Sequence, residues 1–222
     1  MTFADHVLNF LQHVVISTPL PQGVVVLNPY HDKHVFELCR KFYKHYYSDE
    51  RERILILGIN PGRFGAGLTG IPFTDPVKLE KHCGISNTLL KKPELSADFI
   101  YTMIEAFGGP VQFYSKFYFS SVCPLGFIKE GKNLNYYDIR ELQESVKGFI
   151  VYSLKATINF GINTETCYCL GEGKNFDFLN KLNADHKFFK KIIPLAHPRF
   201  IMQYRRKKLN EYLEKYLVKL SP

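Results

Sequence analysis

The sequence lacks any hydrophobic run long enough to span a bilayer, which needs about 20 consecutive apolar residues. Its N-terminus alternates apolar and polar residues and has no basic region before an apolar block, so it does not resemble a secretory signal peptide. These absences predict a soluble protein of the cytoplasm or nucleoid. The 222 residues, 45% of them hydrophobic, predict one well-buried domain over residues 1–222.

Cysteine is scarce, and the number of cysteines, five, is odd. Only Cys167 and Cys169 lie close together in the sequence, so we expect buried thiols in a reducing compartment and no disulfide. His31 and His34 could share one face of a helix, but no cysteine or acidic cluster follows them at the spacing of a zinc site. The sequence therefore predicts no metal centre.

Acidic residues are fewer than basic ones, with 21 Asp and Glu against 29 Lys and Arg and a formal net charge of +8. This excess suggests an anionic partner without identifying it. One short segment contains no acid and holds Arg199, Arg205, Arg206, Lys207 and Lys208. Such a run is either a solvated face or a surface that contacts phosphates, and the run alone does not decide between the two.

Strands and helices alternate after residue 50. Residues 53–57 form a continuous apolar run, typical of a strand that is covered on both faces in a parallel sheet. Further strands are predicted at 116–122, 166–170 and 189–195. We expect helices at 2–15, 33–47, 77–90, 96–107, 138–159 (with Asp138 as N-cap), 173–183 and 204–219. The alternation predicts an α/β fold with a four-stranded parallel sheet and helices on both faces.

The loop after the first predicted strand, residues 58–76, holds five glycines and three prolines. Glycine lets main-chain amides approach a ligand closely and proline fixes the path of the chain, so the composition favours a rigid ligand cradle over a long surface loop. The loop has neither the Gly-Lys-Ser/Thr of a phosphate-binding loop nor a GxGxxG fingerprint, so we expect no nucleotide cofactor. Ligands of parallel sheets bind beyond the carboxyl ends of the strands, which places His197, after the last strand, opposite this loop.

These segments together resemble the single-strand-selective monofunctional uracil-DNA glycosylases of the uracil-DNA glycosylase superfamily. The resemblance runs in order through Asn28-Pro29, Gly58-Ile-Asn-Pro-Gly-Arg-Phe-Gly65, Thr69-Gly-Ile-Pro-Phe73, Ser120-Ser-Val-Cys-Pro-Leu125 and His197-Pro198. It implies a three-layer α/β/α sandwich with a central four-stranded parallel sheet. It also implies hydrolytic excision of uracil from DNA, which leaves an abasic site without strand cleavage.

The resemblance assigns catalytic roles to Asn60, whose amide would hold the attacking water, and to His197, which would donate a hydrogen bond to uracil O2 as charge develops. Base excision needs a pocket for the flipped base, and Phe73 would be its aromatic floor. The structural alternatives are a turn-forming asparagine before proline for Asn60 and a core anchor for Phe73. The remaining predicted substrate-binding residues are Ile59, Gly62, Phe64 and Ser121.

The chain departs from the family pattern at several positions. Ser121 stands where the family has an asparagine that reads the uracil edge with two hydrogen bonds, so the range of bases, uracil or other deaminated or oxidised bases, stays open. Arg63 replaces a proline, and Ala66 replaces a larger side chain. Arg199 and Phe200 would form either a wedge in the vacated base stack or a staple at the entry of a helix. The predicted DNA-contacting residues are Arg63, Arg199, Phe200, Arg205, Arg206 and Lys207.

Two other classes of protein stay open. A DNA-binding protein that keeps the glycosylase fold but has lost efficient catalysis would fit the changes at Ser121 and in the loop of His197. An enzyme that acts on small nucleotides could use the glycine-rich loop as a phosphate cradle, although the missing fingerprints argue against it. In the leading interpretation the protein is a monomer that binds single- or double-stranded DNA and uses no cofactor.

Overall fold

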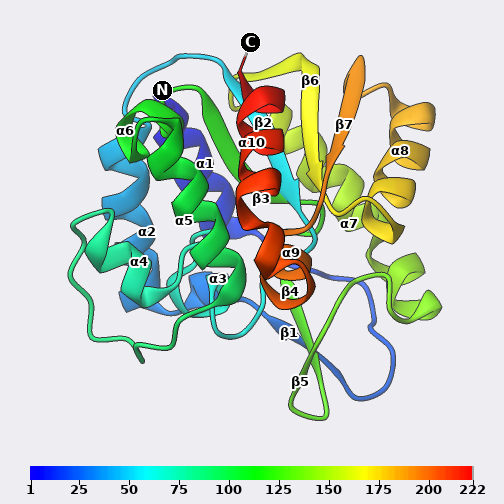
Figure 1. Cartoon of the computed structure of the whole chain (residues 1–222). Helices are drawn as coiled ribbons and strands as arrows, with labels where there is room; N and C mark the ends of the chain where they lie inside the picture. The colour runs from blue at the N-terminus through cyan, green and yellow to red at the C-terminus, as the bar shows by residue number, and fades with distance from the viewer. Residues whose placement is uncertain (222) are drawn as a thin grey trace.

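Four parallel strands form the central sheet of the protein (Figure 1). They are β2 (Arg53–Gly58), β3 (Phe117–Ser121), β6 (Ile162–Leu170) and β7 (Lys191–Leu195), in the order β3-β2-β6-β7. The structure is a computed structural model and describes residues 1–221. Because all neighbouring strands are parallel, their carboxyl ends meet at one edge of the sheet, as the sequence predicts.

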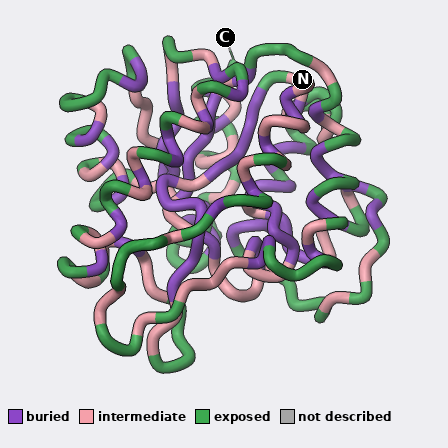
Figure 2. Tube along the Cα trace, turned by 180° about the vertical axis from the view of Figure 1, so that it is seen from behind, coloured by how far each residue is buried: buried purple, intermediate pink, exposed green. Residues whose placement is uncertain are grey.

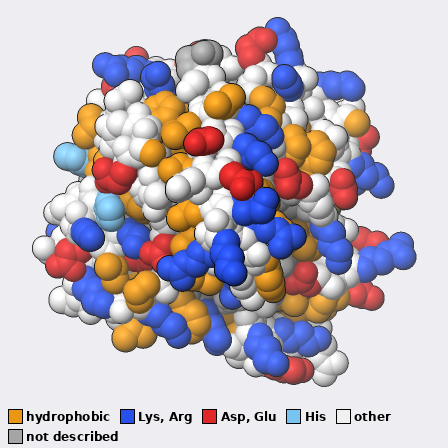
Figure 3. All heavy atoms as spheres, in the orientation of Figure 1, with side chains coloured by type: hydrophobic (Ala, Val, Ile, Leu, Met, Phe, Trp, Pro, Cys, Tyr) orange, Lys and Arg blue, Asp and Glu red, His pale blue; other side chains and the backbone are white. Residues whose placement is uncertain are grey.

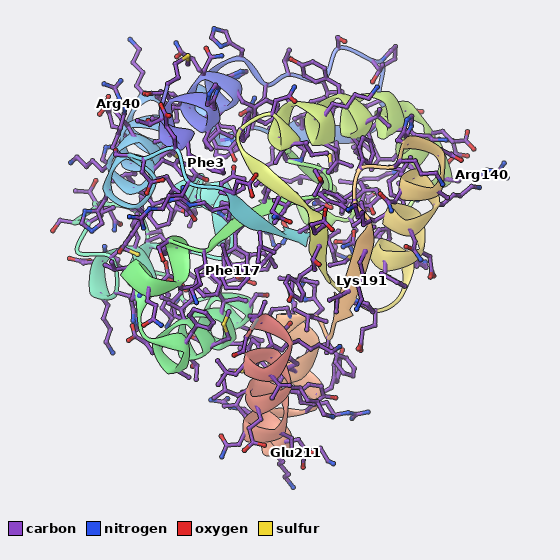
Figure 4. All side chains as sticks on the ribbon, turned by 90° about the horizontal axis from the view of Figure 1, so that it is seen from above. Phe3, Arg40, Phe117, Arg140, Lys191 and Glu211 are labelled. Atoms are coloured by element: carbon purple, nitrogen blue, oxygen red, sulfur yellow. The ribbon has the colours of Figure 1, made fainter. Side chains whose placement is uncertain are left out.

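Helices cover both faces of this sheet (Figure 4). One face carries α1 (Phe3–His13), α2 (Lys33–Tyr46), α7 (Arg140–Ile158) and α8 (Lys174–His186). The other face carries α5 (Leu95–Phe107), α6 (Pro110–Tyr114), α9 (Pro198–Tyr204) and α10 (Leu209–Leu220). The short helices α3 (Ala66–Thr69) and α4 (Pro76–Lys81) and the 3-10 turns η1 (Pro29–His31) and η2 (Arg206–Lys208) complete the chain. This arrangement confirms the predicted α/β/α sandwich.

The strand β3 shows how the core is built on both faces, because successive side chains of a strand point in opposite directions. Tyr118 packs against Phe3 of α1, with ring centroids 5.0 Å apart. Phe117 and Phe119 instead stack on Phe113 of α6, at 4.9 and 5.3 Å. In Figure 2 the buried positions accordingly follow the strands and the inner sides of the helices.

A second sheet, absent from the sequence prediction, lies beside the carboxyl ends of the central strands. It is antiparallel, with the order β1 (Val24–Leu27), β4 (Gly126–Lys129) and β5 (Lys132–Leu134). Its strands have only three or four residues, too few for a clear alternation of apolar and polar positions. A Cβ at Gly126 would collide with the carbonyl oxygen of Pro61, so glycine allows the small sheet to press directly on the glycine-rich loop.

Several predicted helix boundaries were wrong. The helix expected at 77–90 ends at Lys81, and Gly84 takes a left-handed φ of 66°. Asp138 does not cap α7, because Ile139 is the N-cap and the Asp138 carboxylate accepts a hydrogen bond from the amide of Asn135 at 2.8 Å. The helix expected at 204–219 is divided, since the basic residues of η2 separate α9 from α10.

All five cysteines are buried, as the sequence predicts, and their thiols are free in the described part of the chain. Within residues 1–221, no group of three or more His, Cys, Asp or Glu side chains could hold a metal ion. None of the helices in this range combines the length and the apolar character that crossing a membrane requires.

Candidate active site

A cleft of about 680 Å³ opens at the carboxyl ends of the central strands, within the size range of small-ligand sites. Segments that follow each of the four strands contribute to its wall. The structure brings together nine of the predicted site residues in this wall: Ile59, Asn60, Gly62, Phe64, Phe73, Ser121, His197, Arg199 and Phe200. The loops after the first and the last predicted strand therefore face a common space.

Asn60 lies two residues after β2, and its side chain is held by the segment that follows β5. The main-chain amide of Tyr136 donates to Asn60 Oδ1 at 3.0 Å, and Asn60 Nδ2 donates to the carbonyl oxygen of Leu134 at 3.1 Å. An asparagine amide has two lone pairs and two N–H groups. Asn60 Nδ2 also donates weakly to the carbonyl oxygen of Pro61 at 3.4 Å, so both of its N–H groups have main-chain partners. One lone pair of Oδ1 therefore remains for a water molecule or a ligand.

The ring of Phe73 forms part of the cleft wall close to His197, with ring centroids 6.5 Å apart. On its other side it packs on Phe119 of β3 at 5.3 Å. Gly58 makes room for the ring, because a Cβ there would lie 2.7 Å from Phe73 Cζ. The glycine at the end of β2 thus allows an aromatic ring to lie against the end of the sheet.

The backbone of Phe73 is strained, since its φ of 55° lies in the left-handed region that few non-glycine residues adopt. The buried hydroxyl of Thr69 fixes this turn: it accepts from the amide of Ile71 at 3.1 Å and donates to the carbonyl oxygen of Thr74 at 2.6 Å. Strain of this kind persists only where surrounding contacts enforce it. Thr69 therefore holds the orientation of the Phe73 ring.

His197 is the N-cap of α9, and its Nδ1 accepts a hydrogen bond from the amide of Arg199 at 3.2 Å. Burial of the ring, together with the charge of Arg199, lowers the pKa of His197 from 6.5 to about 4. The imidazole is therefore neutral at pH 7. Because Nδ1 is an acceptor, the single ring proton resides on Nε2. His197 is thus a neutral hydrogen-bond donor in the cleft wall.

Ser121 ends β3 beside Gly58 of β2, and its partly exposed side chain lines the cleft. Its hydroxyl offers one donor and two acceptor positions to a ligand in the cleft. The position can thus contribute to base recognition, but with fewer hydrogen bonds than an amide would make.

Four of the predicted DNA-contacting residues lie outside the cleft wall. The amide of Arg63 donates to Asn133 Oδ1 at 3.1 Å, and its guanidinium donates to the carbonyl oxygen of Gly131, so Arg63 fastens the glycine-rich loop to the β4–β5 hairpin. Arg205, Arg206 and Lys207 are exposed just after α9. In Figure 3, Lys and Arg side chains gather over the part of the surface formed by α9 and α10.

Other residues of the cleft wall were missed by the sequence prediction. They are Gly65, Glu94 and Ser96, Asn133, Asn135 and Tyr137, the run from Gly171 to Asn175, and Gln203 and Tyr204. The run after β6 follows a predicted strand, so the rule of ligands beyond strand ends could have found it. The residues around β5 had no such signal, because that strand was not predicted.

Charges of both signs line the cleft. Arg199 and Lys174 are basic, and Glu94 and Glu172 are acidic. Burial raises the pKa of Glu94, and the nearby charge of Arg199 opposes this shift. The carboxyl group of Glu94 thus accepts a proton more readily than an exposed glutamate would.

The protein is thus an α/β/α sandwich whose cleft, at the strand ends, holds an asparagine and a neutral histidine. Residues 45–221 match the family model of the uracil DNA glycosylase superfamily, and the chain belongs to this superfamily. The family recognised from the motifs is thereby confirmed.

Two individual proteins extend this comparison. The crystal structure of wild-type SMUG2 from Pedobacter heparinus superposes with a TM-score of 0.96 and 47% sequence identity, over 99% of this chain and 97% of that chain. The single-strand selective monofunctional uracil-DNA glycosylase of Rattus norvegicus is 28% identical over 145 residues, which cover 56% of this chain and 50% of the rat protein. The chain thus spans about half the length of this curated relative.

Proposed function

We propose that this protein is a monofunctional DNA glycosylase that flips uracil out of DNA and hydrolyses its N-glycosidic bond, leaving an abasic site. The observation that carries the proposal is the presence of Asn60 and neutral His197 in one cleft, next to the ring of Phe73. Membership of the superfamily and the names of the two relatives support it.

The first step is removal of the base from the stack, which costs a few kcal/mol. In the proposal the base stacks on Phe73, and such stacking contributes about 1–3 kcal/mol per base. Phe200, whose side chain is 40% exposed at the rim, fills the vacated stack. Arg199, Arg205, Arg206 and Lys207 bind the neighbouring phosphates, because they are exposed and close in sequence to the rim.

Cleavage of the glycosidic bond leaves positive charge on the sugar and negative charge on the departing uracil. The Nε2–H of His197 donates to uracil O2, where the negative charge develops, and it needs no titration at neutral pH to do so. The free lone pair of Asn60 Oδ1 accepts a hydrogen bond from the water that attacks C1′. An amide is a weak base, which suffices because an oxocarbenium-like sugar requires only a weak nucleophile.

Recognition of the base edge falls to Ser121, whose single hydroxyl is less selective than an amide. The test is an excision panel with purified protein on labelled single- and double-stranded oligonucleotides that carry uracil, hypoxanthine, xanthine or hydroxymethyluracil. We expect release of uracil and a product whose backbone breaks only on alkaline treatment. Absence of base release above a buffer control on every substrate would refute the proposal.

A DNA-binding protein without efficient catalysis is the second candidate, because three main-chain bonds already occupy part of the Asn60 amide and Ser121 replaces an amide. Salt-sensitive binding to the same oligonucleotides, with no base released in a single-turnover assay, would select this alternative.

A further inference from the structure

The side chain of Asn60 is held by three main-chain hydrogen bonds: a weak one to Pro61, one to Leu134 at the end of β5 and one from Tyr136 just after β5. One of these bonds comes from the main-chain amide of Tyr136, at 3.0 Å. The orientation of the Asn60 amide therefore depends on where residue 136 lies. This dependence is long-range, since 76 positions of sequence separate the two residues.

The position of Tyr136 is in turn fixed by its own side chain. The ring is fully buried between Tyr137 and Phe178, with ring centroids 5.0 Å from each. Its hydroxyl donates to Oδ1 of Asn175 at 2.8 Å, and Asn175 is itself only 2% exposed. A hydrogen bond between two buried polar groups is costly to break, because each group would be left without water or a partner.

Asn175 returns the connection to the end of β2, the strand that precedes Asn60. Its Nδ2 donates to the carbonyl oxygen of Leu170 at 3.2 Å, at the end of β6, and more weakly to that of Gly58 at 3.4 Å, at the end of β2. The bonds thus form a closed circuit that runs from Gly58 to Asn60, through Tyr136 and Asn175, and back to Gly58.

From this circuit we infer that Tyr136, braced by Asn175, is a positioning residue that sets the orientation of the Asn60 amide. The inference rests on the proposed function, because it assigns that amide to the attacking water. Tyr136 does not line the cleft, so it acts through Asn60 and not by contact with the substrate. Without the Tyr136 hydroxyl, the main-chain amide that donates to Asn60 would be held less firmly, and the Asn60 side chain could rotate away from the line of attack.

The test is Tyr136→Phe, which keeps the ring and removes only the hydroxyl. We expect uracil release in single turnover to slow by about tenfold or more, while affinity for the abasic product changes less than about twofold. Tyr47→Phe is the matched control: the Tyr47 hydroxyl is also buried and donates to the carbonyl oxygen of Phe117 at 3.0 Å, at the opposite end of the sheet. That variant should keep the wild-type rate.

Two further measurements separate positioning from a general loss of stability. In an Asn60→Ala background, Tyr136→Phe should cause no additional loss of rate, because the two changes remove the same arrangement. Fully additive losses would overturn the inference, as would equal rates for Tyr136→Phe and Tyr47→Phe.

A measurement without substrate covers the case in which the proposed function fails. The side-chain amide signal of Asn60 in a ¹⁵N-resolved NMR spectrum is assigned by its loss in Asn60→Ala. We expect this signal to shift and to exchange faster with solvent in Tyr136→Phe, but not in Tyr47→Phe. An unchanged signal refutes the positioning role, whereas a wild-type protein that releases no base refutes the proposed function alone.

Discussion

At the amino end of β2, Arg53 is fully buried and forms an ion pair with Asp49, and its guanidinium lies 5.2 Å from the ring centroids of Phe3 and Tyr47. Two residues beyond the carboxyl end of the same strand, Asn60 keeps an acceptor position on Oδ1 free in a cleft. The two ends of β2 thus differ: the polar groups at the amino end are buried and paired, whereas those at the carboxyl end face a cleft.

The difference teaches what each end is built for. The amino end satisfies its polar groups within the protein, where Arg53 also donates to the carbonyl oxygens of Arg51 and Tyr114. The carboxyl end tolerates the strained φ of Phe73 and presents the Ser121 side chain to the cleft. Strain and unsatisfied groups are typical of functional sites. Changes at the amino end should therefore lower stability, and changes at the carboxyl end should lower the rate.

The largest effect on stability is expected for Asp49→Ala. This change leaves the buried guanidinium of Arg53 without its counterion and should lower the free energy of unfolding by about 3 kcal/mol. Urea denaturation measures it, and the single-turnover rate of the folded variant should stay at the wild-type value. Glu144→Ala is the control, because it breaks only an exposed, solvent-screened ion pair with Arg140 and should leave the free energy of unfolding nearly unchanged. A slower single-turnover rate in folded Asp49→Ala would contradict the assignment of stability to the amino end of β2 and of the rate to its carboxyl end.

The largest effect on the rate is expected for His197→Ala. Loss of one donor to a developing anion should slow single-turnover uracil release by about a hundredfold or more. The same change removes the N-cap of α9, which costs about 1 kcal/mol of stability. His197→Ser restores a capping hydroxyl but not a donor that reaches the base, so it should regain stability and stay slow. Recovery of the rate in His197→Ser would show that the cap, and not the donor, matters.

The parts of the cleft were not equally predictable from the sequence. The apolar run of β2 and the glycine-rich loop stand out locally, and the motifs placed nine of the predicted residues in the cleft wall. The small sheet escaped prediction because β1, β4 and β5 are too short to show a period. For the same reason the contacts of Asn60 with Leu134 and Tyr136, which lie at and after β5, were not predicted.

The functions of polar side chains were harder to predict than their positions. The contact of Arg63 with DNA stays a prediction, whereas the bond from its guanidinium to Gly131 crosses a turn that sequence patterns do not reveal. Likewise, no pattern marks Asn175 as a brace, because its partners Tyr136 and Leu170 lie on elements that meet only in the folded protein. Hydrogen bonds between distant segments depend on tertiary packing, so local sequence patterns do not predict them.

A smaller effect on the rate, about tenfold, is expected for Thr69→Val. Without the hydroxyl, the turn that holds Phe73 at φ 55° can relax, and relief of such strain is worth about 1–3 kcal/mol. Thr69→Ser keeps the hydroxyl and should restore most of the rate. Thr157→Val, which changes a buried threonine of α7 far from the cleft, should leave the rate unchanged. Equal rates for Thr69→Val and Thr69→Ser would contradict the role of the hydroxyl.

The smallest effect is expected from pH. Since the pKa of His197 is about 4, the single-turnover rate should change less than about twofold between pH 6 and pH 8, across the ordinary histidine pKa of 6.5. The free energy of unfolding should respond at lower pH, between about 4 and 6.5. In the unfolded chain His197 binds a proton near pH 6.5, whereas in the folded protein it does so only near pH 4. The free energy of unfolding should therefore fall as the pH is lowered through this range. His197→Ser should lack this contribution. A rate that titrates near pH 6.5 would contradict this prediction. It would mean that the donor in the cleft is the charged imidazolium form of His197.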